Sequence, residues 1–146
     1  MEFRGYYAFL SNFYRTSIAI DGIIYPTAEH AFQSYKSDEH EYKLEVSRAD
    51  KPSDAKKIGR RIKLIPDWNE KRVDYMRLVV GYKFNQNNDL RDMLIATANT
   101  YLIEDNYWHD NFWGNCKCSK CYEPGFNMLG KILMELRESY LKGGQG

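Results

Sequence analysis

The sequence predicts a single α+β domain that is mainly α-helical and carries a small antiparallel β element near its N-terminus. Three observations support this. A segment rich in β-branched residues and a turn precede the first helix, most later segments repeat their apolar residues with helical spacing, and 146 residues suit one hydrophobic core. We place the domain at residues 1–142 and a flexible tail at residues 143–146.

The β element is expected over residues 16–25. Residues 16–20 are rich in β-branched side chains, Asp21-Gly22 is a typical hairpin turn, and residues 23–25 form the returning strand. Pro26 keeps the preceding residue extended and ends that strand. Thr27 then suits the N-cap of a helix over residues 28–35.

This first helix carries polar side chains at helical spacing. Glu29, Gln33 and Lys36 lie on one face, apart from the apolar face. In the first turn, the helix dipole and unpaired N–H groups favour an ionised Glu29, and a carboxylate in a cleft can act as a general base, orient water or accept ribose hydroxyls. From spacing alone we favour the simpler interpretation, in which Glu29 complements the dipole and the adjacent His30 makes structural hydrogen bonds.

Further helices are expected over about residues 38–49, 52–61, 67–84, 89–94 and 127–141. Asp67 and Glu70 have the spacing of a capping box at the start of the longest of these helices. Residues 101–103 are apolar and predict a short strand.

A long irregular segment, residues 105–126, is rich in Trp, Asn, Gly and Cys. Loops of this length in a compact domain are usually functional. Trp108, Asp110, Trp113 and Gly114 suit a pocket that stacks a flat ring and binds sugar hydroxyls. An equally good interpretation makes both Trp residues core anchors of the loop, and Trp68 has the same two interpretations.

The three cysteines, Cys116, Cys118 and Cys121, cannot pair off completely, which favours a reduced, cytosolic setting. Their close spacing is compatible with Zn²⁺, with His109 as a fourth ligand. Because two cysteine pairs at the usual structural-zinc spacing are absent, we favour reduced thiols and expect no metal.

The charge balance excludes some partners. With 21 basic and 20 acidic residues the net charge is +1, which argues against a general electrostatic nucleic-acid binder. The basic cluster at residues 51–63 is interpreted as a solvated helix face, with phosphate binding as the alternative. No apolar run is long enough for a membrane span, and residues 1–7 show no signal peptide, so we expect a cytoplasmic protein. Nothing in the sequence predicts an oligomeric state.

Several ordered blocks resemble the NADAR family, whose YbiA-like members are N-glycosidases with a predicted link to NAD and ADP-ribose. The blocks are FLSNFY at residues 9–14, YPTAEHAFQ at 25–33, PDW at 66–68, WG at 113–114 and NMLGKIL at 127–133. The match runs from about residue 3 to residue 137. It implies a small, mainly helical hydrolase of N-glycosidic bonds. The family's substrates are phosphoribosylamino-pyrimidine intermediates of riboflavin synthesis and ADP-ribose attached to guanine in nucleic acid.

The resemblance also implies site residues. Glu29 falls on the acidic position of the YPTxEHAFQ block, Asp110 on the acid of a W-G-D block, and Trp68 on the Trp of the P-D-W block. One position departs from the family pattern, because the Gly of W-G-D is His109 here. A larger side chain there can narrow the pocket or rotate Asp110.

The implied reaction explains why acidic residues are needed. Cleavage of a ribose C1′–N bond builds positive charge on the sugar, which carboxylates stabilise while activating water. We expect Glu29 to be the base or sugar-orienting carboxylate and Asp110 its partner, while Trp68 stacks on the base or shapes the leaving-group side. We expect no cofactor. The expected substrate-binding residues are Asn12, Phe13, His30, Gln33, Lys36, Lys56, Arg60, Lys83, Trp108, Trp113, Gly114 and Asn127.

Two other function classes remain open. A non-catalytic module would bind ADP-ribose or a related nucleotide through the same residues, with thermal stabilisation and no turnover. A zinc-stapled interaction protein would be built around Cys116 to Cys121 and would contain stoichiometric zinc.

Overall fold

A computed structural model describes residues 1–143. It divides the chain into two compact units, one of residues 12–87 and one of residues 1–11 together with the chain from Asn88 onward. Of the predicted flexible tail, Gly143 is the last residue of a helix, and residues 144–146 lie outside the described part. One domain over residues 1–142 stays a prediction, because compact units within a chain are not always separate domains.

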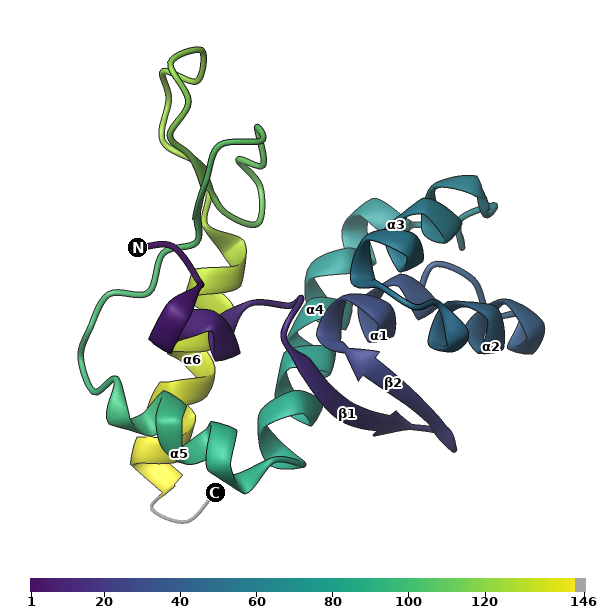
Figure 1. Ribbon diagram of the computed structural model, residues 1–146, viewed down its shortest axis with the longest axis horizontal. Helices are drawn as coiled ribbons and strands as arrows, with labels where there is room; N and C mark the ends of the chain where they lie inside the picture. The colour runs from purple at the N-terminus through teal and green to yellow at the C-terminus, as the bar shows by residue number, and fades with distance from the viewer. Residues whose placement is uncertain (144–146) are drawn as a thin grey trace. The chain divides into compact units, whose positions relative to one another are not determined.

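The unit of residues 12–87 begins with a β hairpin (Figure 1). Strands β1 (Arg15–Ile20) and β2 (Ile23–Thr27) pair antiparallel, with Ile18 opposite Tyr25. The turn between them is the predicted Asp21-Gly22, and both residues have positive φ, as a tight two-residue hairpin turn requires. Ile18 and Tyr25 are buried, so this face of the hairpin contributes to the core. The predicted antiparallel element is confirmed.

Four helices follow the hairpin in this unit. They are α1 (Ala28–Ser34), α2 (His40–Arg48), α3 (Pro52–Arg61) and α4 (Trp68–Asn85). Thr27 caps α1 as predicted, since its Oγ1 accepts the N–H of His30 at 3.1 Å. The capping box predicted at the start of α4 is wrong. Asp67 has φ 60 and makes no side-chain cap bond, because a left-handed residue does not direct its carboxylate at the first-turn N–H groups.

Helix α1 is the centre of this unit. It contacts α2, α3, α4 and β2, and each of its seven residues is buried, including the polar ones. Ala28 and Ala31 are fully buried on its apolar side. Because the neighbouring helices surround α1, its polar face is also withdrawn from solvent, and buried polar groups are stable only with partners. The buried polar face of α1 is therefore a candidate functional site.

The second unit contains the short 3₁₀ helix η1 (Gly5–Leu10), α5 (Asn88–Ala96) and α6 (Met128–Gly143). Two-residue strands β3 (Asp105–Asn106) and β4 (Asn115–Cys116) pair in parallel within the long irregular segment. The strand predicted at residues 101–103 is not formed. Leu102 is nevertheless fully buried, so the apolar pattern there reflects burial of an irregular segment and not a strand.

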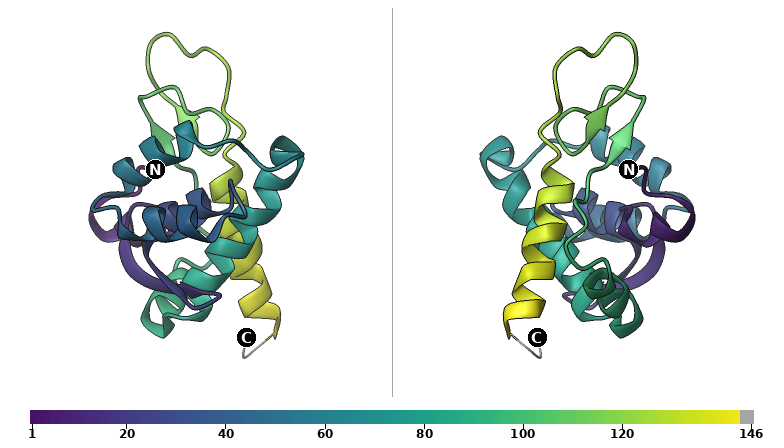
Figure 2. Two further views of the ribbon diagram at one scale, coloured as in Figure 1. Left: turned by 90° about the vertical axis from the view of Figure 1, so that its right-hand side faces the viewer. Right: turned by 90° about the vertical axis from the view of Figure 1, so that its left-hand side faces the viewer.

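The irregular segment is attached to the start of α6. The backbone N–H groups of Phe126, Met128 and Leu129 donate to carbonyls of residues 111–113 at 2.7 to 3.0 Å. Figure 2 shows this segment extending beyond the N-terminal end of α6 in both views. The apolar stripe of α6 (Leu129, Ile132, Leu133 and Tyr140) is buried, as its spacing predicts. Among the residues that the structure describes, no helix combines the length and apolarity needed to cross a bilayer.

Candidate active site

Glu29 lies in the first turn of α1 with its side chain withdrawn from solvent. Only 8% of the residue is exposed, and one carboxylate oxygen accepts a hydrogen bond of 2.6 Å from Nε2 of Gln33. The N–H of Glu29 donates to the carbonyl of Asn12 at 2.9 Å, which holds the residues before β1 against the start of α1. Glu29 is therefore neither directed into bulk solvent nor enclosed by apolar groups alone.

Asn12 and Gln33, which both hydrogen-bond Glu29, each carry a buried side-chain oxygen that can accept a hydrogen bond. Oδ1 of Asn12 and Oε1 of Gln33 have no hydrogen-bond partner among the residues that the structure describes, although 8% or less of either residue is exposed. Such atoms are rare because each costs about 1–3 kcal/mol. Nδ2 of Asn12 contacts the Met76 sulfur and Nε2 of Gln33 contacts Glu29, so each amide oxygen is left to accept a donor from elsewhere.

Gly59 on α3 explains how Gln33 is held. A Cβ at this position would lie 2.0 Å from Oε1 of Gln33, so a larger residue would push the amide away from Glu29. A glycine inside a helix costs stability relative to alanine and usually has a packing reason. The sequence analysis did not include Gly59 in the site, although its position within a helix was the signal that pointed to it.

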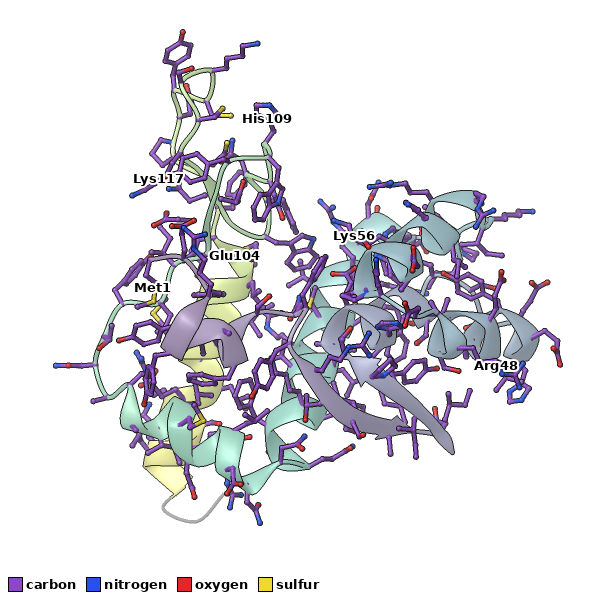
Figure 3. All side chains as sticks on the ribbon, viewed as in Figure 1. Met1, Arg48, Lys56, Glu104, His109 and Lys117 are labelled. Atoms are coloured by element: carbon purple, nitrogen blue, oxygen red, sulfur yellow. The ribbon has the colours of Figure 1, made fainter. Side chains whose placement is uncertain are left out.

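Basic side chains gather beside the carboxylate. Burial lowers the pKa of Lys36, Glu29 opposes this by raising it, and Arg60 and Lys56 lower it further, so all three cations lie within electrostatic range of one another. Lys56 lies with its Nζ 5.8 Å from the ring centre of the exposed Phe13. The structure thus brings residues from α1, α3 and the segment before β1 together, and Figure 3 shows Lys56 on α3.

Trp68 lies at the start of α4 in an aromatic stack. Its ring is stacked on Tyr75 at 6.0 Å, Tyr75 is stacked on Tyr35 at 4.5 Å, and Nζ of Lys36 lies 6.0 Å from the Trp68 ring centre. Trp68 is 8% exposed. The sequence analysis did not include Tyr35 and Tyr75. Tyr75 follows Trp68 by seven residues, and this spacing places both rings on one face of a helix.

His30 makes structural hydrogen bonds, as the simpler interpretation expected, and its contact with substrate stays a prediction. It is completely buried, and both ring nitrogens are bonded within the chain: Nδ1 to Thr27 Oγ1 at 2.7 Å and Nε2 to the Ala49 carbonyl at 2.9 Å. The carbonyl can only accept, so Nε2 carries the proton and Thr27 donates its hydroxyl to Nδ1. Burial lowers the pKa of His30, which keeps the ring neutral. The ring fixes the start of α1 and therefore positions Glu29.

Lys83 on α4 is also enclosed. It is 1% exposed, with Nζ 5.2 Å from the ring centre of Phe84 and 5.9 Å from that of Tyr14. Burial lowers the pKa of Lys83 to about 7. This burial places Lys83 inside the unit, and its contact with substrate stays a prediction.

The Lys83 pKa predicts a pH dependence of stability. An unfolded lysine binds its proton up to about pH 10.5, so between about pH 7 and 10 the unfolded state binds more protons than the folded state. The free energy of unfolding therefore rises with pH in this window. Lys83→Met is expected to remove this slope and to raise the free energy of unfolding near pH 7 by on the order of a few kcal/mol. Urea unfolding from pH 7 to about 10 measures both. Equal slopes in the two proteins would contradict the assignment.

A surface hollow on this unit is lined by other residues. It is lined by side chains of α2 and the end of α3, and none of the predicted site residues takes part. The lining residues are Glu39, Glu41, Tyr42, Glu45, Arg48, Ala49 and Ile62. Three of these residues are acidic and one is basic, so the hollow does not resemble a phosphate site, which needs an excess of cationic groups.

Asp110 belongs to the other unit and makes local hydrogen bonds. Its Oδ1 accepts the N–H groups of Phe112 and Trp113 at 3.2 and 2.9 Å, and Asn106 bonds both its backbone N–H and its carbonyl. Oδ2 makes no hydrogen bond to any residue that the structure describes. One carboxylate oxygen thus orders the turn while the other stays available.

The remaining residues predicted in this segment differ in exposure. Trp108 is 65% exposed, whereas Trp113 is half-buried against Phe112. Gly114 is required by packing, because a Cβ there would lie 2.4 Å from the Glu104 carbonyl. Asn127 is 2% exposed, with Oδ1 accepting the N–H of Glu104 and Nδ2 donating to the Leu102 carbonyl.

Asn127 therefore has a structural role, and its expected contact with substrate stays a prediction. Both ends of its amide are used by the backbone of residues 102–104, and its φ of 51 is the left-handed conformation that asparagine tolerates better than most residues. In the same segment, the side chains of His109 and the three cysteines lie close enough together to share one metal ion.

Comparison with known proteins identifies similar chains. The NADAR domain family profile matches residues 2–141. N-glycosidase YbiA of Shigella flexneri is 40% identical over 138 residues, which cover 90% of this chain and 81% of that protein. A riboflavin biosynthesis protein of Vibrio vulnificus is 37% identical over 134 residues, which cover 90% of this chain and 35% of that protein. The chain thus spans about a third of the length of the Vibrio protein.

A solved structure has the same fold. The NMR structure of the Escherichia coli protein YbiA superimposes with a TM-score of 0.84 at 35% identity, covering 99% of this chain and 86% of that one. This similarity confirms the predicted fold class, a mainly helical α+β chain with a small antiparallel element.

Proposed function

The chain belongs to the NADAR domain family, and from this premise we propose that it is an N-glycosidase that hydrolyses the bond between ribose C1′ and a nitrogen atom. The observation that carries the proposal is the buried Glu29 carboxylate. It is held by Gln33, next to unpartnered amide acceptors and beside cationic side chains. The N-glycosidase name of the Shigella relative supports the same reaction.

The reaction needs a fixed negative charge. As the C1′–N bond breaks, positive charge develops on the sugar, and a carboxylate already in place stabilises it without reorganisation. Water then adds its oxygen to C1′, and the proton that it loses passes first to a carboxylate and then to the leaving nitrogen, so that one water molecule is consumed. Burial of Glu29 strengthens its electrostatic effect, because the local dielectric is lower than that of water.

The surrounding groups suit a nucleotide-like ligand. Oδ1 of Asn12 and Oε1 of Gln33 would accept ribose hydroxyls or N–H groups of the base, which would satisfy both buried atoms. Lys36, Lys56 and Arg60 would meet phosphate. Phe13, exposed beside Lys56, offers a ring for stacking.

We infer two substrate classes for this site. One is a phosphoribosylamino-pyrimidine, which the riboflavin biosynthesis name of the Vibrio relative favours. The other is ADP-ribose attached to guanine in nucleic acid, which a cationic surface at Lys56 and Arg60 would accommodate. The three free thiols suit a reducing compartment, and we place the reaction in the cytoplasm.

Incubation of the purified protein with each substrate class tests the proposal. The phosphoribosylamino-pyrimidine and ADP-ribosylated DNA are supplied separately, and the products are identified by mass spectrometry. We expect free base or free ADP-ribose from at least one of them. Turnover of only one substrate decides between the two classes. Stabilisation of the protein by ADP-ribose without turnover of either would overturn the enzyme assignment and leave a binding module.

A further inference from the structure

Four potential metal ligands converge in the segment between β3 and α6. They are Nδ1 of His109 and the sulfurs of Cys116, Cys118 and Cys121, and all four atoms lie within 4.8 Å of one another. Figure 3 shows the His109 ring with sulfur atoms next to it on the same segment, while Lys117 points away. None of the proposed N-glycosidase chemistry uses these groups.

The separations match the edges of a metal-centred tetrahedron. Nδ1 of His109 lies 3.4 Å from the sulfurs of Cys118 and Cys121 and 3.8 Å from that of Cys116. The sulfurs of Cys118 and Cys121 are 3.5 Å apart. Ordinary Zn–S and Zn–N bond lengths give edges of about 3.8 Å between two sulfurs and about 3.6 Å between sulfur and nitrogen. The two remaining separations, from the Cys116 sulfur to those of Cys118 and Cys121, are within 4.8 Å, so shifts of about 1 Å or less would bring all four atoms to tetrahedral spacing.

The backbone at His109 has a left-handed conformation. Its φ of 68 lies in a region that favours glycine and that histidine adopts more readily than most other residues. The left-handed turn directs the His109 ring back towards the cysteines, 7 to 12 positions further along the chain.

The chain around the cysteines is already arranged as a ligand loop. The backbone N–H of Cys118 points at the Cys116 sulfur at 3.5 Å, and the N–H of Cys116 is held by Oδ1 of Asn111 at 2.8 Å. N–H groups aimed at sulfur stabilise a thiolate, and ligand-orienting bonds of this kind support metal sites. Cys116 is also buried, with 4% of the residue exposed, so one of the four ligands is withdrawn from solvent.

The tip of this loop has little else to order it. Residues 117–124 are exposed or half-buried, and Tyr122 is 91% exposed, so no hydrophobic side chain of the tip enters a core. Short segments without a core are commonly ordered by disulfides or metals. The three cysteines are unpaired, which leaves a metal as the device that fits.

We propose that His109, Cys116, Cys118 and Cys121 bind one Zn²⁺ ion in a tetrahedral Cys₃His site. Four protein ligands close the coordination sphere, which is the pattern of structural zinc and leaves no position for water or substrate. The ion orders the segment around the turn of Asp110, the residue directly after the histidine ligand. Soft thiolates with one imidazole select zinc over magnesium or calcium. The site revises our preference for reduced thiols, which rested on spacing alone.

Metal analysis of the full chain tests the site. Protein produced in zinc-supplemented medium is expected to carry one zinc per chain after desalting, and Co²⁺ exchange should give the visible absorption bands of a tetrahedral thiolate complex. His109→Gly and Cys118→Ser should each weaken zinc binding by more than about a hundredfold, because even the loss of a second-shell partner costs 10–100-fold. Lys120→Ala, an exposed neighbour in the same loop, is the matched control and should bind zinc normally.

The test also separates zinc from a disulfide. Native thiol titration before and after chelation should show the three cysteines protected by zinc and reactive when it is removed. A chain without zinc or cobalt bands overturns the proposal, whether its thiols are free or two of them form a disulfide detected by mass. Circular dichroism of each variant separates loss of the site from loss of the fold. A folded His109→Gly that still binds zinc at wild-type affinity would remove histidine from the ligand set and contradict the Cys₃His site.

Discussion

Glu29→Gln is expected to lower kcat by about a hundredfold or more, the usual cost of removing one preorganised electrostatic group from an active site. Glutamine keeps a side-chain oxygen that can accept the 2.6 Å bond from Gln33, so this hydrogen bond can remain while the charge is removed. Steady-state kinetics on the hydrolysed substrate, with circular dichroism to check the fold, measure the effect.

The matched control separates catalysis from the helix dipole. Glu70 is an exposed first-turn acid of α4, and Glu70→Gln removes a similar dipole interaction, worth about 0.3–1 kcal/mol of stability. Its activity should stay at the wild-type level. If folded Glu29→Gln matched that control in kcat, Glu29 would be a dipole-complementing residue, the interpretation that spacing alone favoured.

Asp110→Asn is the second substitution with a large expected effect. The asparagine oxygen can still accept the N–H groups of Phe112 and Trp113, so the turn is kept while the negative charge is removed. Because a carboxylate stabilises the positive charge that develops on the sugar, we expect this substitution to lower kcat by about a hundredfold or more. The same kinetic assay measures it.

Asp110→Ala completes the comparison, because it removes both the charge and the turn. A purely structural Asp110 would leave the Asn variant active and impair only the Ala variant, which would contradict the catalytic role.

The sequence predicted local structure well wherever neighbouring residues determine it. The Thr27 cap, the Asp21-Gly22 turn and the buried stripe of α6 all follow from short-range chemistry. The capping box at Asp67 failed because one left-handed residue redirected the side chain. The strand predicted at residues 101–103 is not formed, because the apolar pattern there reflects burial of Leu102 and not strand pairing.

The site was only partly predictable for a related reason. Spacing placed Glu29, Gln33 and Lys36 on one face of a helix, and the structure adds Gly59 of α3, which fixes the position of Gln33. His30 and Asn127 match family blocks, yet the polar atoms of both side chains are hydrogen-bonded within the chain. Motif matching identifies positions and does not distinguish a residue that touches substrate from one that holds the chain beside it.

Hydrolysis in water enriched in heavy oxygen is the measurement that tests the central claim most directly. We expect wild-type protein to release the base and mass spectrometry to find the heavy oxygen on ribose C1′ of the sugar product, with Glu29→Gln forming this labelled product about a hundredfold more slowly or less. Release of a sugar without the label, or equal labelled product from the Glu29 variant, would contradict hydrolysis at C1′ by this carboxylate.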